Sequence, residues 1–279
     1  MDLDAADTPE LYRLHTYLQI ALWTTLCAAC NLVIKYRMQL THRSTRAFYL
    51  QHSLFNAVIC YLTWDDMVFT LRHPLDSALC AHTAAGDCAP STALFVMLGI
   101  HVAHCLTDHA TLSITDYVHH ALSCGMSGYF MLVYRLGAVK NFALFYSCGL
   151  PGGITYLALF CAKNGWLGRL TEKRLATVVN QWLRAPMLFL MGYIVLLCHT
   201  EGRLEKAAHG LTNEMPLGVL LSMVAAVSLN GLYFSQLVAV SYGKSLVHAA
   251  LPSSSDKKNT GIRPNVSFIQ DFLGRPRSP

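Results

Sequence analysis

The chain has 279 residues, of which 53% are hydrophobic and only 13% are charged, and its formal net charge is +5. Soluble domains carry about 25% charged residues, so this composition leaves too little polar surface for a soluble globular protein. We therefore expect a membrane protein. In such a protein the positive charge is a topology signal, with some attraction to anionic lipid, and does not indicate nucleic-acid binding.

Several apolar stretches have the roughly 17–25 residues that an α-helix needs to cross a hydrocarbon core of about 30 Å. The stretches are continuous rather than alternating, which favours helices over barrel strands. The predicted fold is an all-α polytopic membrane bundle of about seven transmembrane helices. The expected spans are 16–34, 47–63, 93–113, 118–134, 139–162, 178–199 and 217–241.

The loop charges predict the orientation of these spans. If the loops are assigned alternately to the two sides, one side receives 14 Lys and Arg residues and the other receives 6. The richer side is expected in the cytosol, which places the N-terminus in the lumen and the C-terminus in the cytosol. The chain then divides into a lumenal segment (1–15), a transmembrane domain (16–243) and a flexible cytosolic tail (244–279).

Two of the ten cysteines, Cys80 and Cys88, lie in the predicted lumenal loop 64–92. A disulfide can persist in that compartment, and the sequence leaves open whether these two thiols are bridged. The other eight cysteines lie in or beside apolar stretches, where cysteine is usually a small packing residue.

Polar side chains inside the spans are the main functional signal, because a charge at mid-depth costs about 2.5–3.5 kcal/mol on insertion scales. In the third span, His101, His104 and Asp108 have spacings that place them on one helical face. They could form a lipid headgroup site, a proton relay or part of a metal site. The structural alternative is a packing network in which Asp108 accepts a hydrogen bond from His104 or from a neighbouring helix.

Asp116, His119 and His120 open the fourth span at its expected cytosolic end. A carboxylate one helical turn away can hold either imidazole in a fixed tautomer, which is typical of a catalytic base. The alternative is a pair of ordinary interfacial histidines.

Two further spans carry polar groups. Asn180 and Arg184 lie near the start of the sixth span, where the arginine must reach the interface, pair with an acid, or bind an anionic headgroup. Asn230 and Tyr233 lie one turn apart in the last span, where an asparagine usually contacts another helix. Convergence of these groups would let them satisfy one another, so we expect one cavity open to the cytosolic leaflet that includes Arg184, His119 and His120.

In this order along the chain, these residues resemble the TLC domain, the membrane fold of ceramide synthases and several small lipid-related proteins. The resemblance covers roughly residues 40–245. It rests on His52-Ser53, Asp108, Asp116-Tyr-Val-His119-His120, Tyr134-Arg-Leu-Gly137, Asn141, Asn180, Arg184-Ala-Pro186 and Asn230-Gly-Leu-Tyr233.

The resemblance implies a protein that binds, senses or modifies membrane lipids, most simply in the endoplasmic reticulum or another endomembrane. In an enzymatic form, His119 or His120 would be the base or nucleophile of acyl transfer from acyl-CoA to a lipid amine, oriented by Asp116. The implied lipid-binding residues are His52, His104, Asp108, Asn180, Arg184 and Asn230. Ceramide synthases also carry an aspartate-rich stretch on the next helix, and the chain departs from them because 145–153 contains no acid.

A metal-dependent intramembrane lipid hydrolase of the alkaline-ceramidase type is the alternative. His101, His104 and Asp108, with His119 or His120, would then hold zinc and activate water. That family places paired histidines late in the chain, where this sequence has only His199. The preferred interpretation needs no bound metal or cofactor and has membrane lipids as partners, and nothing in the sequence indicates an oligomer.

The orientation can be tested by glycosylation mapping in a eukaryotic membrane. The natural sequon at Asn265 should stay unmodified because the tail is expected in the cytosol. A sequon introduced near Gly86 should be glycosylated, which would be visible as an endoglycosidase-sensitive mass shift. The opposite pattern would reverse the topology and move His119 to the lumenal side.

Overall fold

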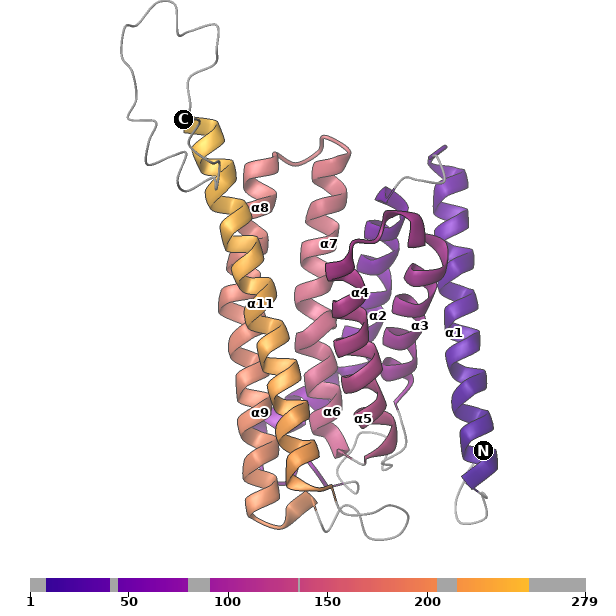
Figure 1. Cartoon of the computed structure of the whole chain (residues 1–279), viewed down its shortest axis with the longest axis vertical. Helices are drawn as coiled ribbons and strands as arrows, with labels where there is room; N and C mark the ends of the chain where they lie inside the picture. Colours follow the sequence, from indigo (N-terminus) through magenta and orange to yellow (C-terminus); the bar gives the residue numbers. More distant parts are fainter. Residues whose placement is uncertain (1–8, 41–44, 80–90, 135, 205–214, 251–279) are drawn as a thin grey trace, which may run out of the picture.

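The computed structural model describes residues 9–40, 45–79, 91–134, 136–204 and 215–250, and every regular element in these ranges is a helix (Figure 1). The predicted all-α fold is confirmed for these residues, whereas Cys80, Cys88 and the sequon at Asn265 lie outside them. The elements are α1 (Pro9–Arg37), α2 (Arg46–Arg72), α3 (Thr92–Thr107), η2 (His109–Thr111), α4 (Ile114–His120), η3 (Ala121–Gly128), α5 (Tyr129–Val133), α6 (Gly137–Leu144), η4 (Phe145–Gly149), α7 (Leu150–Lys163), α8 (Arg169–Val179), η5 (Asn180–Arg184), α9 (Ala185–Thr200) and α11 (Leu217–Ala250).

Five helices in the described ranges are long and apolar enough to cross a membrane, which indicates an integral membrane protein. They are Arg13–Arg37, Arg46–Arg72, Gly137–Lys163, Arg169–Thr200 and Leu217–Ala249. The predicted third span lies on α3, a shorter apolar helix of 16 residues that ends at Thr107 instead of continuing to residue 113. The predicted fourth span lies on the continuous helical run formed by α4, η3 and α5.

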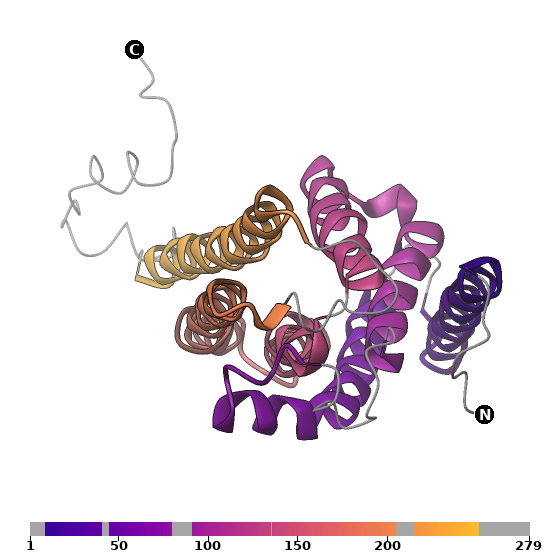
Figure 2. The ribbon, with the colours of Figure 1, turned by 90° about the horizontal axis from the view of Figure 1, so that it is seen from below.

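The helices form a bundle in which α6 is the most enclosed element. All eight residues of α6 are buried, and Phe142 and Leu144 are among the largest fully buried side chains. Around it, α2 packs against α6 and α7, while α11 packs against α8 and α9. Seen from below, α1 lies at one side of the bundle and α11 lies toward the opposite side (Figure 2).

The outer helix α1 packs mainly against α3, and a glycine makes this contact close. A methyl group added at Gly99 of α3 would lie 2.7 Å from Cβ of Trp23. Small residues at such contacts let two membrane helices approach by van der Waals packing, which replaces the hydrophobic effect inside a bilayer.

A buried ion pair joins the end of α1 to the end of α3. The ammonium of Lys35 lies 3.1 Å from Oδ1 of Asp108, and both side chains are almost completely buried. Asp108 also accepts a hydrogen bond from the Thr107 hydroxyl. Asp108 therefore has the structural role given above as the alternative: it pairs with a neighbouring helix and does not line the cavity described below.

Breaking this pair should destabilise the bundle. Removing one partner of a buried ion pair costs about 3–5 kcal/mol, because the other charge is left uncompensated. We expect Asp108→Asn to lower the thermal midpoint of the purified protein, and Lys35→Met combined with Asp108→Leu to recover much of the loss. Asp76→Asn is the matched control, because its pair with Arg203 is exposed and such pairs contribute little. An unchanged midpoint in Asp108→Asn would contradict the structural role.

Candidate functional site

Three continuous helical runs contain a π-helical segment: η3 between α4 and α5, η4 between α6 and α7, and η5 between α8 and α9. Such segments are rare, and they occur frequently at functional sites. Pro151 and Pro186 stand just after η4 and η5. Proline lacks a backbone N–H and clashes with the carbonyl four residues earlier, which explains why the regular helix gives way there.

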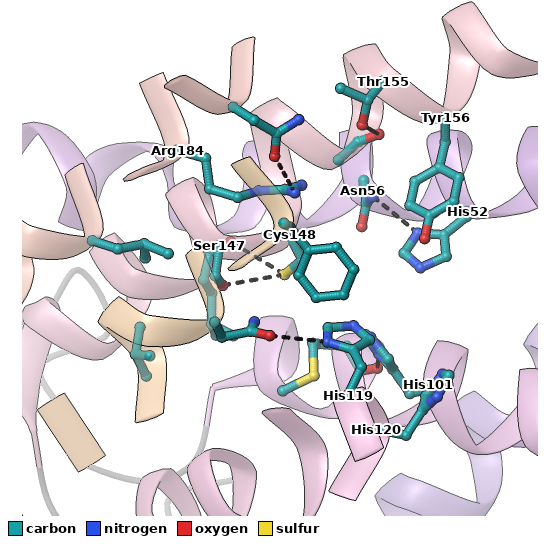
Figure 3. Close-up of a pocket in the computed structure, with 18 of the residues that line it drawn as sticks. His52, Asn56, His101, His119, His120, Ser147, Cys148, Thr155, Tyr156 and Arg184 are labelled. Atoms are coloured by element: carbon teal, nitrogen blue, oxygen red, sulfur yellow. Dashed lines mark hydrogen bonds between the residues drawn. The ribbon is translucent and has the colours of Figure 1, made fainter. Parts of the chain in front are cut away.

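All three π-helical segments contribute to a single cavity of about 280 Å³ (Figure 3). Apolar side chains from α3, α5, α6, α9 and α11 form part of its wall. The rest is polar, and ten of the polar lining residues matter here: His52, Asn56, His101, His104, Asp116, His119, His120, Asn180, Arg184 and Asn230.

The expected convergence is thus confirmed for most of the predicted residues. Arg184 lines the same cavity as His119 and His120, and His52, His104, Asp116, Asn180 and Asn230 line it too. Asp108 is the exception, because it is held at the end of α3 by Lys35.

The cavity wall contains a cluster of five histidines from α2, α3 and α4. The ring of His120 lies 5.3 Å from those of His101 and His104 and 5.4 Å from that of His119. His101 lies 5.6 Å from His52, which extends the cluster to α2. We call these residues the histidine cluster.

Aromatic packing fixes three of these rings. Phe48 stacks on His104 with a centroid distance of 3.6 Å, and Tyr156 stacks on His52 at 4.1 Å. The edge of Phe234 meets His119 at 4.6 Å. The rings are therefore positioned by packing as well as by hydrogen bonds.

Hydrogen bonds select a tautomer for the two adjacent histidines. His119 Nδ1 lies 3.2 Å from Oδ1 of Asn230, and His120 Nδ1 lies 2.5 Å from the carbonyl oxygen of Asp116. An oxygen acceptor at Nδ1 requires the proton on that nitrogen, so each neutral ring carries its lone pair on Nε2. This is the protonation state that a general base needs.

The prediction that the Asp116 carboxylate orients the imidazoles is wrong in its geometry. That carboxylate closes a capping box at the start of α4, where it accepts from the Ser113 backbone N–H at 2.8 Å and from its hydroxyl at 2.7 Å. Asp116 positions His120 through its carbonyl group instead.

Arg184 is a partly buried cation without an acidic partner in the described part of the chain. Its Nη1 donates to Oδ1 of Asn180 at 2.6 Å, while its Nε is buried and has no hydrogen-bond acceptor. The acids nearest the cavity are engaged elsewhere, since Glu172 pairs with Lys173 at 3.2 Å and Asp116 caps α4. The guanidinium therefore brings an uncompensated positive charge to the cavity.

The sequence interpretation missed several residues that line the cavity, notably Asn56, Tyr156, Gly152 and Cys148. Asn56 is completely buried, and its Nδ2 lies 2.9 Å from Nδ1 of His52. One signal could have identified it, because Asn56 follows His52 by one helical turn inside an apolar span. Gly152 and Cys148 carry no such signal.

No group of three or more His, Cys, Asp or Glu side chains in the described residues is arranged to hold a metal ion. No family model, curated protein or solved structure matches the chain.

An unpaired buried cation should destabilise the empty protein. Replacing Arg184 with Gln removes the charge and keeps an amide that can contact Asn180, so Arg184→Gln should raise the thermal midpoint of delipidated protein. For a chain of this size a change of 1 kcal/mol corresponds to about 2–4 °C. Differential scanning fluorimetry measures the shift, with Arg203→Gln as the control at an exposed arginine. A marked fall in the midpoint would show that Arg184 is mainly structural.

Proposed function

We propose that this chain is a lipid-handling membrane protein of the TLC type, whose cavity binds the anionic group of an amphipathic lipid through Arg184. In this proposal α3 and the run Ile114–Val133 complete seven spans, with the N-terminus in the lumen and the C-terminus in the cytosol. An endomembrane such as the endoplasmic reticulum is the expected location.

The single observation that carries the proposal is the Arg184 guanidinium, which lies in the cavity wall and pairs with no acid in the ranges that the structure describes. A cation inside a bundle is tolerated when it is paired, and among the described residues the hydrogen bond from Arg184 goes to the Asn180 amide oxygen. A carboxylate or phosphate would complete the site, because the planar guanidinium can donate two parallel hydrogen bonds to either group.

The rest of the cavity fits the apolar part of such a ligand. Met97, Met131, Leu144 and Leu188 are buried side chains in its wall, and they come from α3, α5, α6 and α9. Binding sites for small molecules combine a mostly apolar wall with a few polar groups that fix orientation. The volume suits one headgroup with part of one chain.

The histidine cluster adds a route to catalysis. In an acyl-transfer form, Nε2 of His119 or His120 takes the proton of a lipid amine as its nitrogen attacks the thioester carbonyl of acyl-CoA. The carbon–sulfur bond breaks, an amide forms, and the proton leaves with the thiol of CoA. Asn230 and the Asp116 carbonyl would hold the two imidazoles in the tautomer that this step requires.

The test is lipid mass spectrometry on protein purified in mild detergent. Wild-type protein and Arg203→Gln should carry the same anionic lipid, whereas Arg184→Gln should lose most of it, because a charge-assisted hydrogen bond contributes about 1.5–3 kcal/mol. Equal amounts on all three proteins would contradict the role of Arg184. Stoichiometric zinc in the wild type, lost in His101→Ala, would instead favour the metal-dependent hydrolase.

A further inference from the structure

Two side chains leave hydrogen-bonding capacity unused in the same part of the cavity. Oδ1 of Asn56 is a buried acceptor without a donor, and Nε of Arg184 is a buried donor without an acceptor. Asn180 accepts a hydrogen bond from Nη1 of Arg184 and leaves Nε unengaged. An unsatisfied buried polar group costs about 1–3 kcal/mol, so both residues point to a ligand that supplies the missing groups.

Gly152 of α7 packs against Asn56 and lies close to Arg184 in the cavity wall. A methyl group placed at Gly152 would lie 2.5 Å from Nδ2 of Asn56 and 3.7 Å from Nη2 of Arg184. Figure 3 shows the end of Arg184 on the side of Asn56, whose amide is turned to His52, with His119 and His120 across the cavity. We call Asn56, Gly152 and Arg184 the headgroup chamber.

The amide of Asn56 has a defined orientation in this chamber. Its Nδ2 contacts Nδ1 of His52, whose ring is fixed by stacking on Tyr156. Nδ2 is also the atom of Asn56 nearest Gly152, and Oδ1 is the atom left without a donor. The cavity wall thus carries an unused acceptor on Asn56 together with the guanidinium of Arg184.

We propose that the headgroup bound here pairs its anionic group with an adjacent hydrogen-bond donor of its own. The anionic group binds Arg184, and a neighbouring hydroxyl or N–H donates to Oδ1 of Asn56. An α-hydroxy carboxylate, an N-acyl amino acid and a protonated phosphate ester share this chemistry. The inference rests on the proposed function, because it assumes that Arg184 binds the anion.

The experiment compares two probes of the same chain length, decanoic acid and α-hydroxydecanoic acid, each enantiomer of the latter being tested separately. Dissociation constants are measured on delipidated full-length protein by isothermal titration calorimetry. In the wild type, one enantiomer should bind roughly three- to tenfold more tightly than decanoic acid. Asn56→Leu should remove this difference in affinity and should still bind decanoic acid. The ratio of the two dissociation constants is compared between variants, so that the difference in hydrophobicity between the probes cancels.

Asn31→Leu is the matched control. Asn31 is also almost fully buried and also has an unpaired Oδ1, but it bonds Gln51 and does not line the cavity. Its substitution should leave the preference for the hydroxy acid unchanged. If Asn56→Leu does not fold, Gly152→Ala serves instead, because its methyl group would displace the Asn56 amide.

The outcomes separate the two proposals. A hydroxyl preference that persists in Asn56→Leu or Gly152→Ala, or that is absent from the wild type, overturns the inference and leaves anion binding at Arg184 intact. Failure of the wild type to bind any of these acids, or equal binding by Arg184→Gln, overturns the proposed function and the inference with it.

Discussion

A positive charge buried within a membrane bundle constrains much of the structure around the cavity. Arg184 lies on a helix that is long and apolar enough to cross a bilayer, so exposure to lipid would be costly. The bundle instead places the guanidinium in a cavity whose walls also carry Asn56, Asn180 and Asn230. These polar groups can satisfy one another or a ligand only because they are brought together.

The backbone is adapted to the same requirement. η3, η4 and η5 interrupt three separate helices, and each of them contributes side chains to the cavity. A π-helical turn rotates the residues that follow it relative to a regular helix. Together with Pro151 and Pro186, these turns allow helices that pack through apolar faces to present Ser147, Cys148 and Arg184 to the cavity.

Much of this site could be predicted from the sequence. A polar residue in an apolar span costs free energy if it faces lipid, so its presence indicates an interior or functional position. The involvement of Arg184, the adjacent histidines and Asn230 followed from that rule. The partner of Asp108 could not be predicted, since the residues of α1 give no indication that Lys35 meets the end of α3. The spacing Ser113-x-x-Asp116 is typical of a capping box and could have predicted the capping role of Asp116. The nearby histidines favoured a catalytic interpretation instead.

The contributions of Asn56 and Gly152 required the three-dimensional arrangement. Asparagine and glycine both occur in membrane helices for ordinary packing, so neither residue type by itself indicates a site. Their part in the site follows from the closeness of Gly152 on α7 to Asn56 on α2 and to Arg184 on η5. Such a contact depends on which helices are neighbours, and periodicity within one helix cannot reveal it.

The most direct test of the central claim is an electron cryomicroscopy structure of the protein purified with its native lipids. The account predicts elongated density inside the cavity, with an anionic group within hydrogen-bonding distance of Arg184 and an apolar tail toward Leu144 and Leu188. An Arg184 side chain turned to bulk water, with the histidine cluster facing lipid elsewhere, would contradict it.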